Sequence, residues 1–147
     1  MNPENDFSQP CTIVLKNDVV EVNRLVTFVE DACKAVHMDE ATSFNIGLAM
    51  EEAVVNVMRY GYPEGTKGEV QVKTFTSDGK LTFEISDDGK PFDPTTVEDP
   101  DMSLSARQRP IGGLGIYLMR QFMDSMNYRR EGDRNVLTLS KNLNFAL

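Results

Sequence analysis

The sequence has few of the residues that support a disulfide framework, a sulfur-ligated metal site or a membrane span. It contains two cysteines, Cys11 and Cys33, one histidine and no tryptophan among 147 residues. Two isolated cysteines are too few for a disulfide framework or a zinc knuckle, so we expect two reduced thiols. No apolar run approaches the roughly 20 residues that cross a bilayer, and residues 1–10, expected to be flexible, lack the features of a signal peptide. The sequence therefore predicts a cytoplasmic protein that does not enter a membrane.

Basic residues are also scarce. Lys and Arg number 15 against 23 Asp and Glu, which gives a net charge of −8 and argues against nucleic acid as a partner, because nucleic acid is bound through basic surface. The charge is uneven: residues 1–100 carry 8 Lys and Arg against 19 acids, whereas residues 101–147 carry 7 against 4. The second group includes six arginines, which suit forked contacts with phosphate or carboxylate, although a solvated basic face would explain them equally well: Arg107, Arg109, Arg120, Arg129, Arg130 and Arg134.

A single domain is predicted, because the chain is long enough for one core and no linker divides it. We assign residues 11–147 to this domain. Hydrophobic periodicity predicts the order strand, helix, helix, hairpin, helix and a closing pair of strands. The predicted elements are a strand over 12–16, helices over 19–36 and 39–60, strands over 69–75 and 80–86, a helix over 113–126, and strands over 127–130 and 135–140.

Turn and capping residues mark the limits of these elements. Asn17-Asp18 is typical of a helix cap, and the glycine and proline of Gly61-Tyr62-Pro63 end the second helix. Ser77-Asp78-Gly79 joins the two strands of the hairpin. Residues 94–110 lack periodicity and are rich in Pro, Thr, Ser and charge, so they predict a long mobile loop.

The predicted helix 39–60 carries a narrow polar stripe on a helix otherwise expected to be buried, Phe44 included. At about 100° per residue, Asn45, Glu52, Asn56 and Arg59 fall within roughly 60° of one another. A buried carboxylate and amide need a partner, and Mg²⁺ is the simplest, because it prefers oxygen ligands and is commonly shared with phosphates. Asn56 could then bind the metal while Glu52 orients or deprotonates a nucleophile. Alternatively, the stripe faces solvent and Glu52 and Arg59 form a surface pair.

Two further segments carry chemistry suited to a ligand. Asp87 follows the predicted strand 80–86, where its carboxylate could accept from an exocyclic amine such as that of adenine, and Gly89 lets the backbone approach a ligand plane. Gly112-Gly113-Leu114-Gly115 lies where the third helix begins, and free backbone N–H groups at a helix N-terminus suit phosphate. Neither a Walker loop nor a dinucleotide fingerprint is matched. Taken alone, the first segment is an ordinary turn and the second is weak.

The three segments together resemble the GHKL ATPase superfamily, and within it the single-domain anti-sigma-factor serine kinases. They are Glu52-Ala-Val-Val-Asn56, Asp87-Asp-Gly-Lys-Pro-Phe-Asp93 and Gly112-Gly-Leu-Gly-Ile116. The resemblance extends over residues 11–141. It implies a two-layer α/β sandwich, with a mixed, largely antiparallel sheet and helices on one face. ATP would lie between a helix and a lid of residues 94–111.

The resemblance also implies a role for individual residues at one half of the site. The N box of the family falls on Glu52 and Asn56, which implies a catalytic base and a Mg²⁺ ligand. The first glycine box falls on Asp87 and Gly89, with Asp87 as the implied adenine contact. Pro91 stands where that box usually has its last glycine.

At the other half, the second glycine box falls on Gly113 and Gly115, the implied phosphate contacts, with Gly112 before them and Leu114 between them. Arg109 lies one place earlier than the expected lid arginine. Tyr60 stands where many of these kinases have histidine.

The function implied by the resemblance is that of a protein-serine kinase that uses ATP and Mg²⁺. It would phosphorylate a serine of an anti-sigma-antagonist protein and so bind or release a sigma factor. His37, expected to be structural or solvated at a helix end, leaves the phosphoacceptor on another protein. Two alternatives stay open: an ATP-binding module that switches partners without phosphoryl transfer, and an acidic adaptor whose polar stripe faces solvent. A homodimer through an apolar face is a further expectation.

Overall fold

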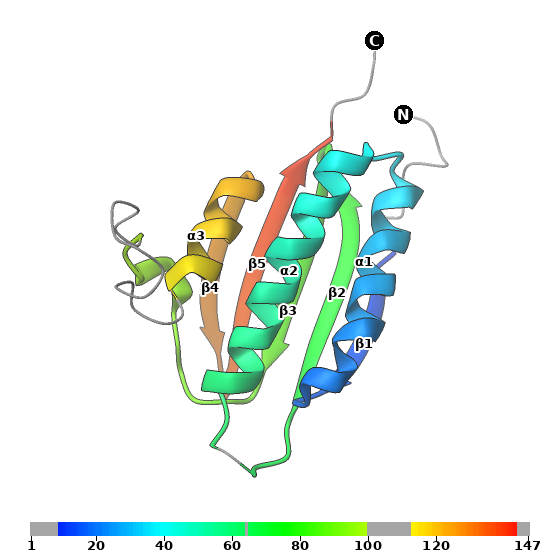
Figure 1. Ribbon diagram of the computed structural model, residues 1–147. Helices are drawn as coiled ribbons and strands as arrows, with labels where there is room; N and C mark the ends of the chain where they lie inside the picture. Colours follow the sequence, from blue (N-terminus) through cyan, green and yellow to red (C-terminus); the bar gives the residue numbers. More distant parts are fainter. Residues whose placement is uncertain (1–8, 64, 100–112, 144–147) are drawn as a thin grey trace.

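The protein, described by a computed structural model over residues 9–63, 65–99 and 113–143, consists of two layers. A five-stranded sheet forms one layer and three α-helices cover one of its faces (Figure 1). The strand order is β1-β2-β3-β5-β4, and all four pairings between these strands are antiparallel. The expected fold is confirmed, with an antiparallel sheet in place of a mixed one. The strands are β1 (Cys11–Lys16), β2 (Glu69–Ser77), β3 (Lys80–Asp87), β4 (Ser125–Glu131) and β5 (Arg134–Asn142).

The β2–β3 hairpin confirms the turn predicted from its sequence. Asp78 and Gly79 have φ of 52° and 73°, and positive φ at two successive residues is the geometry of a type I′ turn. Alternate residues of β2 are buried, and Leu81, Phe83 and Ile85 of β3 are at most 1% exposed. This alternation places one face of the sheet against the helices.

The first two helices begin at acidic caps. The Asp18 carboxylate accepts from Val20 N–H at the start of a 3₁₀ turn, η2 (Val19–Glu21), which leads into α1 (Val22–Ala35). Asp39 accepts from Thr42 N–H at 2.9 Å and starts α2 (Glu40–Tyr60). The expectation that α2 is buried except for one stripe is wrong, because Phe44 is 67% exposed. The buried side faces the sheet and consists of Ile46, Ala49, Met50, Ala53, Val54 and Met58.

The third helix, α3 (Gly113–Phe122), is shorter than predicted. Met123 N–H makes a helical hydrogen bond to Met119 O, but Asp124 N–H donates to Ser140 O of β5. Pairing with β5 therefore ends the helix and starts β4 at Ser125, so Met126 belongs to a strand. The loop expected over 94–110 begins with a 3₁₀ turn, η3 (Pro94–Thr96), and residues 100–112 lie outside the described residues.

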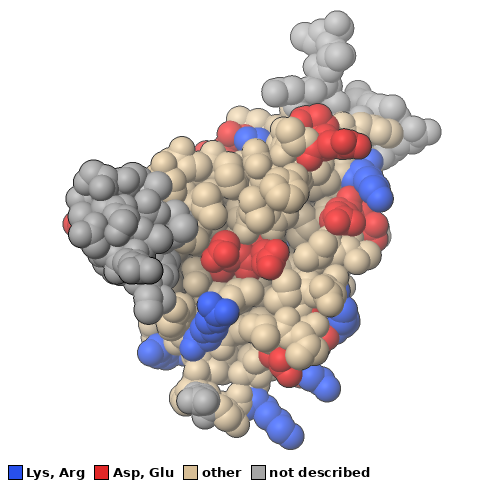
Figure 2. Space-filling view, viewed as in Figure 1, with Lys and Arg blue, Asp and Glu red and all other residues tan. Residues whose placement is uncertain are grey.

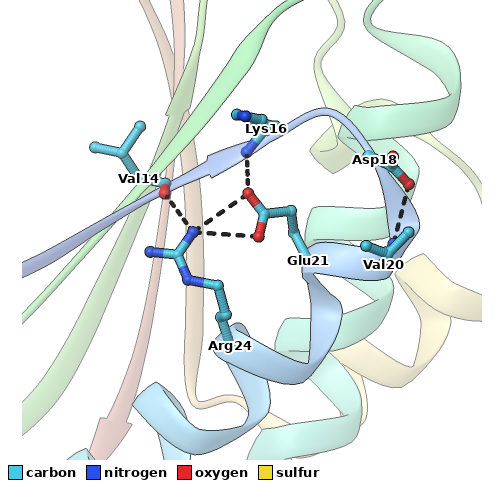
Figure 3. A network of polar contacts seen from close by, with 6 residues as sticks. All are labelled: Val14, Lys16, Asp18, Val20, Glu21 and Arg24. Atoms are coloured by element: carbon cyan, nitrogen blue, oxygen red, sulfur yellow. Dashed lines mark hydrogen bonds and ion pairs between the residues drawn. The ribbon is translucent and has the colours of Figure 1, made fainter.

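The outer edge of β1 carries a compact polar network (Figure 3). Lys16 N–H donates to Glu21 Oε1 at 3.1 Å, and Arg24 Nη1 donates to Val14 O at 3.3 Å. Arg24 and Glu21 also form an ion pair of 3.2 Å. The Lys16 N–H and then the Arg24 guanidinium hold the pKa of Glu21 below its usual range. Two backbone groups of an edge strand thus find their partners in side chains.

Both cysteines are free thiols, as expected, with Cys11 exposed and Cys33 buried. Burial raises the pKa of the Cys33 thiol. None of the helices within the described ranges combines the length and the hydropathy needed to cross a membrane.

Candidate functional site

The three predicted segments meet where α2 ends, β3 ends and α3 begins. A hollow there is lined mostly by apolar side chains from α2, α3, β3 and β5. Its polar lining includes Asn56 of α2, Asp87 of β3, Tyr128 of β4 and Asn135 of β5. Asn56 and Asp87 were predicted as site residues from the sequence, and the fold brings them to one hollow. We call the hollow around Asp87 the Asp87 end of the candidate site, and the adjoining region where Gly115 meets Glu52 and Asn56 the Gly115 end.

Asp87 is a buried carboxylate whose hydrogen bonds to described residues all reach one of its two oxygens. It is 3% exposed, and its Oδ1 accepts from Gly89 N–H at 2.9 Å and from Asn135 Nδ2 at 3.1 Å. Within the described ranges, no hydrogen bond reaches Oδ2. A buried polar oxygen of this kind calls for a hydrogen-bond donor.

Gly89 is needed for the close approach of two backbone segments. A Cβ at this position would lie 2.3 Å from Gly61 O, just after α2, and 2.8 Å from Asp87 Oδ1. Lys90 N–H donates to the same Gly61 O at 3.0 Å. Gly89 thus lies against the end of α2 in this structure, and its expected approach to a ligand plane stays a prediction.

Tyr62 stabilises the junction between the end of α2 and the end of β3. The turn motif in which it occurs did not indicate this role. Its hydroxyl lies 2.7 Å from Asp88 Oδ1 and 3.0 Å from Glu69 O, and it accepts from Asp88 N–H. The ring packs so closely on Gly68 that a Cβ there would lie 2.4 Å from it. Burial, followed by the Asp88 carboxylate, raises the pKa of Tyr62, so the hydroxyl stays protonated and can donate.

At the Gly115 end, the first turn of α3 lies directly against the polar stripe of α2. A Cβ on Gly115 would lie 2.7 Å from Glu52 Oε2 and 3.3 Å from Asn56 Nδ2. Glu52 and Asn56 are both partly exposed. Neither the described ion pairs nor the hydrogen bonds between described residues join Glu52 to Arg59, so the alternative of a surface pair finds no support there.

The donor set at the Gly115 end suits a hard cation. A carboxylate and an amide on one helix face supply oxygen ligands, and few protein ligands are needed for a Mg²⁺ that keeps waters and is shared with phosphate. No group of three or more His, Cys, Asp or Glu among the described residues is arranged to hold a metal by itself.

The described arginines of the C-terminal group bind protein atoms. Arg120 donates to Asp99 Oδ1 at 2.6 Å and to carbonyl oxygens at the end of η3. Arg130 donates to Gly89 O and Arg134 to Ser86 Oγ. Arg129 pairs with Glu131 and Glu84. Arg107, Arg109 and Gly112 lie outside the described residues.

Asn135 and Tyr128 are polar members of the site that sequence reasoning missed. Asn135 is 6% exposed and stands directly across from Asp87 in the β3–β5 pairing. The signal in the sequence is an asparagine near the start of β5, directly before the apolar pair Val136 and Leu137. Its meaning depends on the register between β3 and β5, which the sequence alone does not reveal.

Charged groups are unevenly placed on the helix-covered face of the molecule. Figure 2 shows a group of acidic side chains over α2, while basic side chains lie mainly toward the end where α2 finishes. The site is therefore not surrounded by one sign of charge.

A family profile described as "Histidine kinase-like ATPase domain" matches residues 15–141, which is most of the chain. The chain belongs to this family. Its membership agrees with the resemblance drawn from the three segments, all of which fall inside the match. Glu52, Asn56 and Asp87 therefore stand in a histidine kinase-like ATPase domain.

Several curated relatives of this ATPase domain are named as kinases or anti-sigma factors. The serine/threonine-protein kinase BtrW of Bordetella bronchiseptica is 29% identical over 97 residues, covering 66% of this chain and 68% of BtrW. The serine-protein kinase RsbW of Listeria monocytogenes is 30% identical over 99 residues, covering 64% and 63%. An anti-sigma F factor of Thermoanaerobacter is 30% identical over 82 residues, covering 56% and 57%. The matches thus extend over roughly two thirds of each relative or less.

Solved structures support the fold of this ATPase domain. A crystal structure of the RsbU and RsbW domains of a Mycobacterium tuberculosis protein has a TM-score of 0.64 at 15% identity, covering 91% of this chain and 32% of that chain. The histidine kinase domain of a blue-light activated histidine kinase from Erythrobacter litoralis has a TM-score of 0.52 at 16% identity, covering 85% and 60%.

Proposed function

We propose that this protein is an ATP- and Mg²⁺-dependent protein-serine kinase that phosphorylates an anti-sigma-antagonist protein and thereby switches a sigma factor between bound and free states. The observation that carries the proposal is Asp87, a buried carboxylate in a largely apolar hollow beside the Glu52–Asn56 face, with one oxygen that accepts no hydrogen bond from the described residues. Family membership and the names of the relatives support it. A cytoplasmic location and a homodimer belong to the same proposal.

At the Asp87 end, the site binds the purine of ATP. Asp87 Oδ2 accepts a hydrogen bond from the 6-amino group, and the apolar walls contact the faces of the ring. A carboxylate acceptor favours adenine over a 6-oxo purine, because an oxygen placed opposite Oδ2 would leave two acceptors facing each other.

At the Gly115 end, the site holds the phosphates and performs the transfer. Asn56 is the protein ligand of Mg²⁺, which supplies charge neutralisation on the phosphates when bound. Glu52 accepts the proton of the attacking serine hydroxyl. Backbone N–H groups of Gly113, Leu114 and Gly115 face the phosphates at the start of α3. Gly112 and Arg109 are assigned to the phosphates by the resemblance alone.

Isothermal titration of ATP, with and without Mg²⁺, tests the binding site. We expect micromolar binding that needs Mg²⁺, weakened at least about tenfold in Asn56→Ala and in Asp87→Asn. Asn45→Ala on α2 and Asp133→Asn in the β4–β5 turn are the matched controls and should bind as the wild type does. Failure of the wild-type protein to bind any nucleotide would favour the adaptor interpretation.

Phosphoryl transfer is tested separately, with γ-labelled ATP and purified anti-sigma-antagonist proteins from the same organism. We expect label on a serine of one of them and a loss of about a hundredfold or more in Glu52→Gln, with Glu51→Gln as the control on the neighbouring position. Full transfer by Glu52→Gln removes Glu52 from the role of base. Tight ATP binding without transfer to any antagonist protein favours a partner-switching module that does no chemistry.

A further inference from the structure

We propose that Asn135 is a positioning residue that orients the Asp87 carboxylate toward the purine and holds the backbone on both sides of Pro91 as a rigid wall of the pocket. The inference rests on the proposed function, because it concerns how this site selects adenine. Asn135 acts through Asp87 and does not itself contact the nucleotide.

The side-chain amide of Asn135 is fully used by the protein. Its Nδ2 donates to Asp87 Oδ1 at 3.1 Å and to Lys90 O at 2.9 Å. Its Oδ1 accepts from Phe92 N–H at 3.3 Å and from the Tyr128 hydroxyl at 2.5 Å. A primary amide has two N–H donors and two acceptor lone pairs, so no capacity is left for a ligand.

The partners of Asn135 also fix the direction in which its amide points. Phe92 N–H is a backbone group that can only donate, and Lys90 O can only accept. Exchanging the amide nitrogen and oxygen would place the amide oxygen against two acceptors, Asp87 Oδ1 and Lys90 O. It would also place the amide nitrogen against a donor, the Phe92 N–H. The orientation that directs Nδ2 at Asp87 is therefore the one the surroundings allow.

This geometry decides which oxygen of Asp87 is presented to the purine. Asn135 Nδ2 and Gly89 N–H both bind Oδ1, and together they fill the acceptor positions of that oxygen. Oδ2 is left to meet the ligand. Because the carboxylate is held before the ligand arrives, binding loses less side-chain freedom.

The same amide compensates for the proline at position 91. Proline has no N–H and fixes φ, so the segment around Pro91 has fewer backbone hydrogen bonds of its own. Asn135 binds the carbonyl of Lys90 and the N–H of Phe92, the residues on either side of the proline. Lys90 and Phe92 line the pocket beside Asp87. The proline and the asparagine together thus make this wall stiff.

Leucine and aspartate cannot make this set of bonds at position 135. Leucine keeps the approximate volume but supplies none of the four bonds. Aspartate has no N–H donor when ionised and would place a second carboxylate beside Asp87. Asn135→Leu therefore removes the positioning interaction, and Asn135→Asp replaces it with repulsion between two carboxylates.

The test compares ATP with purine riboside triphosphate, which lacks the 6-amino group, on wild-type and variant proteins by isothermal titration. We expect the wild type to prefer ATP by at least about tenfold. In Asn135→Leu, ATP affinity should fall about tenfold while the affinity for the analogue changes less than about twofold, so the preference is lost. A residue that only supports the pocket would weaken both nucleotides equally, and that result overturns the proposal.

A milder variant covers the case in which Asn135→Leu does not fold. Tyr128→Phe removes one of the two donors to Asn135 Oδ1 and should reduce the preference for ATP in the same direction, by about threefold. Asn127→Leu, at an exposed position of β4, is the matched control and should retain the wild-type preference. An unchanged preference in Tyr128→Phe counts against the proposal.

A second measurement needs no nucleotide. Amide hydrogen exchange in the free protein should show the Phe92 N–H losing protection in Asn135→Leu, because its acceptor is gone. The outcomes separate the two proposals. If the wild type binds no ATP, both the proposed function and this inference are overturned. If the wild type prefers ATP and Asn135→Leu keeps the same preference, only this inference is overturned.

Discussion

The Asp87 end and the Gly115 end of the site both rest on α2, but they are built differently. At the Asp87 end, the Asn135 amide donates to the Asp87 carboxylate and the Tyr62 hydroxyl donates to the neighbouring Asp88. The backbone at Gly89 also packs against the backbone at Gly61. At the Gly115 end, the side chains of Glu52 and Asn56 are partly exposed and meet the first turn of α3 across a glycine.

This difference teaches where the site is rigid and where it can adjust. Selecting one purine requires a fixed acceptor, and a saturated hydrogen-bond network supplies it. Handling phosphates and a metal requires side chains that can rearrange as ligands enter, and flexible groups on a helix face supply that. The predictions below substitute residues at each end, beginning with the largest expected effect.

Gly89→Ala should break the Asp87 end. The added Cβ would lie 2.3 Å from Gly61 O, a backbone atom that cannot move without α2 or β3 moving too. We expect a loss of about 3 kcal/mol in the free energy of unfolding and loss of ATP binding. Urea denaturation and ATP titration measure the two effects. A stable Gly89→Ala protein with wild-type affinity would show that this junction is not rigid.

Gly115→Ala makes the same substitution at the other end, with a different expected result. The nearest atom to the new Cβ is Glu52 Oε2, the tip of a flexible side chain. The free energy of unfolding should change by no more than about 1 kcal/mol, since alanine also favours a helix. Phosphoryl transfer should fall by about tenfold to a hundredfold, because Glu52 is displaced. If this variant unfolds as readily as Gly89→Ala, the two ends do not differ in rigidity.

Tyr62→Phe probes a single bond of the Asp87 end. Loss of the hydroxyl leaves Asp88 Oδ1 and Glu69 O without this donor, and we expect a loss of about 1 kcal/mol in the free energy of unfolding. Tyr60→Phe is the matched control, because Tyr60 is 40% exposed. Urea denaturation of the two variants gives the comparison, and equal stability would mean that the Tyr62 hydroxyl contributes nothing to the junction.

Asp39, at the start of α2, lies away from both the Asp87 end and the Gly115 end of the site, so a substitution there serves as a reference. Thr42 N–H holds the pKa of Asp39 below its usual value of 3.8, so the ionised form stabilises the fold, and this contribution is lost as the pH falls through the folded-state pKa. Asp39→Asn keeps a helix cap without the charge. We expect its stability relative to the wild type to rise as the pH falls below about 4, measured by urea denaturation, with ATP affinity at neutral pH unchanged. Glu40→Gln is the control.

Elements with local signals were predictable from the sequence. Asp78 and Gly79 specify a turn by backbone conformation alone, and Asp39 and Pro63 mark the limits of α2. The N-box spacing placed Glu52 and Asn56 on one helix face, and the structure shows both beside Gly115. In each case, residues within one or two turns of each other determine the outcome.

Features set by contacts distant in sequence were not predictable in the same way. The apolar spacing of α3 continues through Met126, yet the bond from Asp124 N–H to Ser140 O ends the helix earlier. The role of Asn135 depends on its register with Asp87, which is 48 residues away. The contacts of the C-terminal arginines were unpredictable for the same reason. The number of arginines does not indicate which carbonyl or carboxylate each one binds.

The Glu21–Arg24 pair at the edge of β1 bears on how the protein behaves at high concentration. An edge strand is a template on which a strand of another molecule can add, and such addition starts aggregation. Val14 O and Lys16 N–H, two of the groups that a newcomer would need, are already bound by this ion pair. We therefore expect Glu21→Ala to aggregate at concentrations at which the wild type stays dispersed, even though its nucleotide site is untouched.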